Sequence, residues 1–132
     1  MLSTDALAEL QKDWFPHITD SGLDRLVELL EKRSPFLIHG SFTRAVPMGC
    51  LATQIAWHHP KTSCLTQEAG ISWLATVAGL NPASSRVIRD WDADARHDPE
   101  TVQNLLDLFR NEQSRRRLEG EAILHEQELV EV

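Results

Sequence analysis

Apolar residues recur along most of this chain at the three- and four-residue spacing that is typical of amphipathic helices. The clearest stripe consists of Leu23, Leu26, Val27 and Leu30, with Glu28, Glu31, Lys32 and Arg33 on the opposite face. Comparable stripes comprise Leu7, Leu10 and Trp14; Met48, Leu51, Ala52 and Ile55; Ile71, Leu74, Val77 and Ala78; Val87, Ile88 and Trp91; and Val102, Leu105, Leu106 and Phe109. The pattern predicts an all-α fold, a compact bundle of about five to six short helices.

Capping residues and prolines predict where these helices begin and end. Ser3, Thr4 or Asp5 can cap the first helix, Thr19 or Ser21 the second and Thr66 the fourth, whereas Pro16, Pro35 and Pro60 end the first three. The third helix is expected to begin near Pro47 or Gly49. Asn81-Pro82 and Asp98-Pro99 pair a capping residue with the residue preferred in a first turn, so they predict the starts of the last two helices.

Glycine and the intervening loop complete this prediction. Gly79 followed by Leu80 predicts a left-handed C-cap with its apolar contact. Residues 35–47 are predicted to form a loop. Its apolar part, 36–39, could be extended but has no second strand with which to pair, so no sheet is predicted.

The length of 132 residues allows one domain. We assign residues 1–117 to a helical domain and 118–132 to a C-terminal tail. Ile123, Leu124 and Leu129 make this tail too apolar to be an obviously solvated end. It is expected to be either a loose helix or a docking arm.

Composition narrows the classes of function. No apolar run approaches the roughly 20 residues that cross a bilayer, so a membrane protein is not expected. The acidic first fifteen residues do not resemble a secretory signal, and a cytoplasmic location is expected. The net charge of -7 disfavours nucleic acid as a partner without excluding a local basic face. No sequence fingerprint indicates a cofactor, and none is expected.

The segment from Ile71 to Trp91 resembles the DNA-binding helix-turn-helix family over about twenty residues. One helix ends at Ala78-Gly79, a short turn follows, and the second helix carries Arg86 and Arg89. The resemblance implies DNA contacts from Ser84, Ser85, Arg86 and Arg89. The second helix departs from the family pattern, because Ser85 stands where an apolar residue is expected, and an ordinary helical corner is the simpler interpretation.

The acidic connection after this segment is similar to the calcium loop of the EF-hand family. Asp90, Asp92 and Asp94 alternate between two predicted helices and could supply oxygen ligands. Ala95 replaces the turn glycine and Thr101 replaces the closing glutamate. Helix capping and solvation explain these carboxylates more simply.

Cys50 lies near a predicted helix start, where a helix dipole lowers a thiol pKa. His58, His59 or His97 could act as its base, in the manner of a papain-like peptidase, although the strands of that family are not predicted here. Cys50 and Cys64 with a histidine could also bind zinc, but their wide spacing differs from the common zinc motifs. A small buried cysteine is the simpler interpretation.

The order of three motifs resembles a group of small bacterial all-helical proteins. GCLA begins at Gly49, VIRDWD at Val87 and TVQNLLDLF at Thr101. In that group a cysteine-containing helix precedes an I-x-x-W-N-D turn and a T-x-x-V-x-x-L-L helix; here Asp92 replaces the asparagine. The resemblance implies a helical fold and no particular activity.

These observations favour a non-enzymatic helical module that binds a protein partner or a second copy of itself. Trp14, Trp57, Trp73 and Trp91 are expected to form core corners rather than ligand stackers. Helix-turn-helix binding of DNA through residues 71–91 is the alternative.

Overall fold

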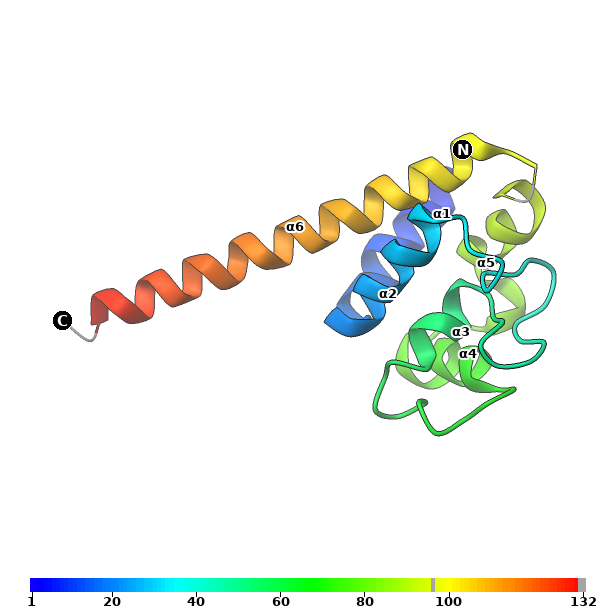
Figure 1. The fold of residues 1–132 in the computed structure, drawn as a ribbon, viewed down its shortest axis with the longest axis horizontal. Helices are drawn as coiled ribbons and strands as arrows, with labels where there is room; N and C mark the ends of the chain where they lie inside the picture. Colours follow the sequence, from blue (N-terminus) through cyan, green and yellow to red (C-terminus); the bar gives the residue numbers. More distant parts are fainter. Residues whose placement is uncertain (96, 131–132) are drawn as a thin grey trace.

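The computed structural model describes residues 1–95 and 97–130, with side chains as far as residue 121. Among these residues there are six α-helices, which are labelled in Figure 1. They are α1 (Thr4–Glu9), α2 (Asp20–Glu31), α3 (Leu51–Ala56), α4 (Ala69–Ser72), α5 (Arg86–Asp90) and α6 (Pro99–Val130). No β-strand occurs among these described residues, and the predicted all-α class is confirmed.

The helices form a packed body from which one helix projects. Helix α2 packs against α3 and α6, α3 packs against α4, and α5 packs against α1. Figure 1 shows α6 passing α2 and then continuing well beyond the body as one helix. The boundary predicted between residues 117 and 118 therefore lies within a continuous helix.

Most of the predicted caps are present. The side-chain oxygens of Ser3 and Thr19 accept hydrogen bonds from the first turns of α1 and α2. Asp98 accepts one from the Glu100 amide at 3.0 Å where α6 begins. Asn81-Pro82, however, starts only a 3₁₀ turn, Pro82–Ser84, and α5 begins after a second cap at Ser85.

The region predicted to begin the third helix is mostly loop. Helix α3 begins at Leu51, and Gly49 instead forms bridges with Leu37 and Thr43. The apolar run at 36–39 therefore has a backbone partner, contrary to the sequence prediction. The buried Gln54 side chain donates hydrogen bonds to the carbonyls of Pro47, at 2.8 Å, and Phe36, at 3.0 Å, and so holds this loop on α3.

Three π-helical turns interrupt the helical spacing, at Leu10–Trp14, Trp73–Val77 and Trp91–Ala95. Each contains one buried tryptophan, and the rings of Trp14 and Trp73 meet edge to face with their centroids 5.2 Å apart. Trp57 is only half-buried, and its indole nitrogen donates to the Leu65 carbonyl at 3.2 Å. Three of the four predicted core tryptophans therefore lie fully in the core.

A close contact between α3 and α4 sets the orientation of α4. A Cβ on Gly70 would overlap the hydroxyl of Thr53 and lie 2.9 Å from the Thr53 amide. Because the small side of α4 faces α3, Ile71 turns outward and is 41% exposed, contrary to its predicted burial. The predicted C-cap is present: Gly79 has φ +72°, and the Leu80 amide donates to the Leu74 carbonyl at 2.8 Å.

Candidate functional site

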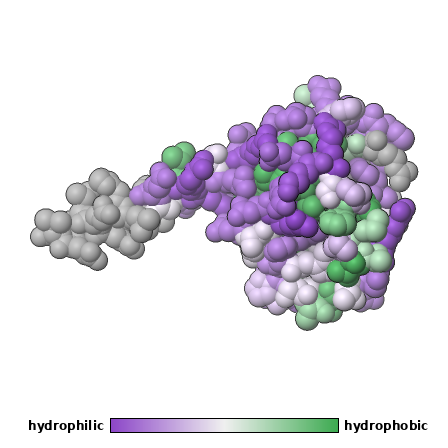
Figure 2. All heavy atoms as spheres, in the orientation of Figure 1, coloured by the Kyte–Doolittle hydropathy of each residue, from purple (hydrophilic) through white to green (hydrophobic). Residues whose placement is uncertain are grey.

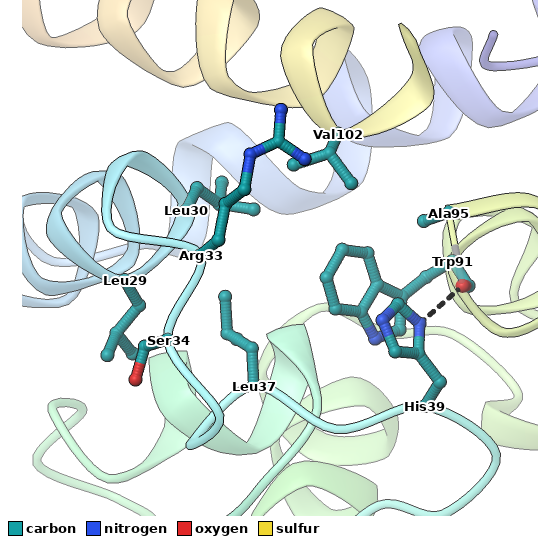
Figure 3. A pocket seen from close by; sticks show the side chains of 9 residues that line it. All are labelled: Leu29, Leu30, Arg33, Ser34, Leu37, His39, Trp91, Ala95 and Val102. Carbon is teal, nitrogen blue, oxygen red and sulfur yellow. Dashed lines mark hydrogen bonds between the residues drawn. The ribbon is translucent and has the colours of Figure 1, made fainter. Parts of the chain in front are cut away.

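A small pocket lies between the end of α2, the following loop, the π turn after α5, and α6. Its volume is about 220 Å³, and polar and apolar surface contribute equally to its wall. Figure 3 shows Leu30 and Leu37 on one side, Trp91 and His39 on the other, and Arg33 reaching toward Val102 across the top. The lining residues are Leu29, Leu30, Arg33, Ser34, Leu37, His39, Trp91, Ala95 and Val102.

Arg33 enters this pocket from a strained position at the end of α2. The Ser34 amide donates to the Leu29 carbonyl at 2.9 Å, and the Arg33 amide donates to the Leu30 carbonyl at 3.2 Å. These two bonds define a Schellman motif, in which the residue after the helix is left-handed and usually glycine. Arg33 occupies that position with φ +49°, the one positive φ among described residues other than glycine.

His39 is held against Trp91 by two interactions. The rings stack with their centroids 4.0 Å apart and their planes at 20°, and His39 Nδ1 lies 2.8 Å from the Trp91 carbonyl oxygen. Because a carbonyl only accepts, Nδ1 carries the proton in this bond. The Trp91 indole nitrogen in turn donates to the Ile38 carbonyl at 2.7 Å, so loop and π turn fix one another.

The chemistry of this pocket is that of a binding site. Arg33 is its one side chain of fixed charge, and it has no ion-pair partner among the side chains that the structure describes. The Ser34 hydroxyl accepts from the Phe36 amide at 3.1 Å, and Figure 3 shows it turned away from the pocket. Leucine, valine and tryptophan side chains beside one cation suit recognition of a small anion that has an apolar body.

A second candidate surface follows the exposed side of α6. Leu108, Asn111 and Arg115 contribute to a groove of about 510 Å³ whose other wall includes Phe15 and Pro16. The positions 108, 111 and 115 continue to Leu118 at the same three- and four-residue spacing, so they share one helix face. Leu118 is 64% exposed. We call this surface the α6 face.

Buried charges anchor α6 to the body just before it projects. Glu112 is 6% exposed and accepts hydrogen bonds from the guanidinium groups of Arg115 and Arg116, both at 2.7 Å. These hydrogen bonds, Arg115 first, hold the pKa of the Glu112 carboxyl below its usual value despite burial. Arg116 also donates to Asp20, at 2.9 Å, and to the Phe15 carbonyl, at 2.8 Å.

The tail residues predicted to meet a partner are Ile123, Leu124 and Leu129. These residues lie in α6, but the structure describes only their backbone and not their side chains. Their contacts therefore stay a prediction. Figure 2 shows that the described part of the projecting helix is mostly hydrophilic, with little apolar surface.

The residues predicted to bind DNA have partners within the protein. The Ser85 hydroxyl donates to Glu9 at 2.7 Å, and the Arg86 side chain donates to Asp5 at 2.7 Å. Arg89 contacts Asp90 at 3.4 Å, and Ser84 lies exposed in the 3₁₀ turn before α5. DNA binding stays a prediction, and these carboxylates oppose the approach of a phosphate backbone.

The carboxylates predicted to bind calcium are directed to separate partners. Asp90 accepts hydrogen bonds from the amide and hydroxyl of Ser3, at 2.9 and 2.8 Å, and Asp92 accepts one from the Gly40 amide at 2.8 Å. Asp94 is exposed in the π turn. Within residues 1–95 and 97–121, no three histidine, cysteine, aspartate or glutamate side chains lie together as a metal site.

Cys50 is buried at the N-terminus of α3, with its sulfur 3.6 Å from the Thr53 hydroxyl. Burial raises the pKa of its thiol to about 11, although hydrogen bonds with Thr53 act in the opposite direction. A thiol nucleophile needs a lowered pKa. Cys64 is exposed, and the predicted zinc group of Cys50, Cys64 and a histidine is not assembled among the described side chains.

The histidines predicted to act as a base for Cys50 are His58, His59 and His97. His59 Nδ1 accepts from the Lys61 amide at 3.1 Å, and its pKa is lowered by partial burial and then by the charge of Lys61. His58 and His97 are exposed. A role for any of them with Cys50 stays a prediction.

The sequence prediction did not identify Arg33 and His39 as site residues. Arg33 was assigned to the solvated face of α2, although a residue at a helix end just before Ser34-Pro35 is a candidate for the left-handed position. His39 had no distinguishing signal, because Trp91 lies 52 residues away along the chain.

Comparisons with protein-family models, curated proteins and solved structures found no match to this chain. The resemblance to small bacterial helical proteins therefore stays a prediction. Among the described residues, no helix combines the length and apolar character needed to cross a membrane.

Proposed function

We propose that this protein is a non-enzymatic helical interaction module and that its partner is a second copy of the chain, bound through the α6 face. The observation that carries the proposal is the path of α6, which leaves the body as an unbroken helix and exposes 64% of Leu118. This face also adjoins the groove beside Phe15 and Pro16. An apolar position next to a groove is suited to a helix from a partner.

Helix energetics support a partner for the projecting part. A helix segment of about 12–15 residues is marginally stable in water without tertiary packing. Gly120 weakens it further, because glycine costs about 1 kcal/mol relative to alanine inside a helix. A Cβ on Gly120 would have no neighbour within 4 Å, so the body offers this turn no packing. Packing against another helix would offset these costs.

Charge supports an antiparallel partner. Arg115 and Arg116 already pair with Glu112, whereas Arg117 is exposed at the start of the projecting part and forms no ion pair among the described side chains. Glu119, Glu121, Glu126 and Glu128 follow in the sequence. Two antiparallel copies would place Arg117 of one helix beside the acidic end of the other. The last turn of one copy would then lie near the groove of its partner, and the pair would have the two-fold symmetry that is commonest among homo-oligomers.

Mass measured by light scattering over a range of protein concentrations tests this proposal. The full chain should approach twice 14.9 kDa at high concentration, and added salt should shift the transition to higher concentration. Leu118→Gln should reduce association at least fivefold. The matched control Ile71→Gln, at a residue 41% exposed on α4, should not reduce it.

Removal of residues 118–132 should abolish association while the body keeps its cooperative unfolding transition by circular dichroism. A monomeric mass at every concentration would refute self-association. Equal effects of Leu118→Gln and Ile71→Gln would refute the assignment of the α6 face.

A further inference from the structure

The pocket between Arg33 and Trp91 has a chemistry that self-association through α6 does not use. Its walls combine the apolar side chains of Leu30, Leu37 and Trp91 with an equal share of polar surface, and one guanidinium reaches across its top (Figure 3). A hollow with a cation at its edge is suited to a ligand that has one charged end and one apolar end.

The conformation of Arg33 indicates that its side chain has a specific use. A left-handed residue other than glycine carries a steric penalty, and glycine is the usual solution at this position of a Schellman motif. Arg33 carries this steric penalty at φ +49°, and its guanidinium lies over the pocket (Figure 3). Among the described residues, no carboxylate forms an ion pair with it, so its fork of donors remains available for an anion.

Arg33 determines which way such a ligand would lie. It is the one side chain of fixed charge at the pocket, so a carboxylate would lie at Arg33. The apolar body would then lie between Leu37 and Trp91, beside the His39 ring that stacks on Trp91 (Figure 3).

The volume limits the ligand to a small molecule. About 220 Å³ corresponds to roughly seven water molecules at about 30 Å³ each. We propose that this pocket binds a small monocarboxylate with an apolar body, of about the size of phenylacetate, with its carboxylate paired to the Arg33 guanidinium. Carboxylate and guanidinium match as a bidentate pair, and the body would replace water against leucine, valine and tryptophan.

Titration of the full chain with three probes tests the ligand class. The readout is the chemical shift of the Trp91 indole N–H, assigned by its loss in Trp91→Phe. Phenylacetate should bind with a dissociation constant of about 1 mM or tighter. Phenylacetamide, which has the same shape without the charge, and acetate, which lacks the body, should each bind at least tenfold more weakly. Equal binding of phenylacetate and phenylacetamide would overturn the proposal, as would no shift with about 10 mM phenylacetate.

Two variants test the role of the guanidinium. Arg33→Gln should weaken phenylacetate binding at least tenfold and change phenylacetamide binding less than twofold. The matched control Lys32→Gln removes the neighbouring cation, whose ammonium pairs with Glu28 at 3.1 Å and does not line the pocket. It should change phenylacetate binding less than twofold. Unchanged affinity in Arg33→Gln, or equal losses in both variants, would refute the assignment.

This inference does not depend on the proposed function. Leu118→Gln lies outside the pocket and should bind phenylacetate as the unmodified chain does. A protein that is monomeric but binds phenylacetate would refute self-association alone. One that self-associates without binding phenylacetate would refute the pocket assignment alone.

Discussion

Replacement of Arg33 by glycine is expected to stabilise the protein while it removes the proposed anion contact. In the left-handed region a residue with a side chain costs roughly 1–2 kcal/mol, and Arg33 lies there at φ +49°. Glycine also increases the entropy of the unfolded chain, which costs about 0.4–1 kcal/mol. The difference is a net gain of about 0.5–1 kcal/mol in the free energy of unfolding.

Lys32→Gly is the matched control, because Lys32 has an ordinary φ of -82°. At that position glycine relieves no strain, and the free energy of unfolding should fall by about 0.5–1 kcal/mol. Urea denaturation followed by circular dichroism measures both variants. The Arg33→Gly midpoint should rise, with Tm about 2–4 °C higher. A loss of stability in Arg33→Gly equal to that in Lys32→Gly would refute the strain argument. Because the strained residue carries the proposed anion contact, the rise in the free energy of unfolding should be accompanied by tenfold weaker phenylacetate binding.

Three further predictions concern the body. Gly70→Ala should lower the free energy of unfolding by about 1–3 kcal/mol, because its Cβ would overlap the Thr53 hydroxyl. Denaturant titration measures this change, and an unchanged midpoint would contradict the close packing of α4 on α3. Burial acts to raise the pKa of Asp90, but hydrogen bonds from Ser3 and Arg89 outweigh it, so the pKa lies below its ordinary value of 3.8. Its stabilisation is fully present above about pH 4 and is lost as the pH falls through the folded-state pKa. Asp90→Asn should therefore be less stable at pH 7, with a difference that shrinks as the pH falls below about 4; a difference independent of pH would oppose this. Cys50, whose pKa is raised to about 11 by burial, should react with a thiol reagent at neutral pH only through unfolding, whereas rapid labelling of both cysteines in the native protein would contradict its burial.

The helices of the body could be predicted from the sequence where helical spacing was regular. The stripe of Leu23, Leu26, Val27 and Leu30 is buried as predicted, and the Asp98-Pro99 start of α6 is correct. In both segments local signals and tertiary packing agree, so the sequence alone is sufficient.

The orientation of α4 could not be predicted in this way. Regular spacing placed Ile71 inside, but the contact between Gly70 and Thr53 turns the small side of α4 toward α3. The π turn that follows at Trp73–Val77 inserts a residue into the helical repeat, which a fixed spacing does not represent. Both effects arise from a neighbouring helix rather than from local sequence.

The pocket could not be predicted from the sequence either, because it depends on contacts between segments that are distant along the chain. It joins the end of α2 to His39 and Trp91, and the hydrogen bond that fixes His39 spans 52 residues. A local pattern predicts which face of a helix is apolar, but not which distant loop covers it. The tail prediction was based on Ile123, Leu124 and Leu129, whereas the described helix presents Leu118 and the adjoining groove.

Sedimentation equilibrium of the full chain beside Gly120→Ala shows whether the α6 face holds two copies together. Alanine removes a cost of about 1 kcal/mol from the projecting helix, and its Cβ meets no atom within 4 Å. The unmodified chain should dimerise reversibly, and Gly120→Ala should lower the dissociation constant about 25-fold, because both helices of the dimer gain about 1 kcal/mol. A mass of 14.9 kDa for both proteins at every concentration would contradict it.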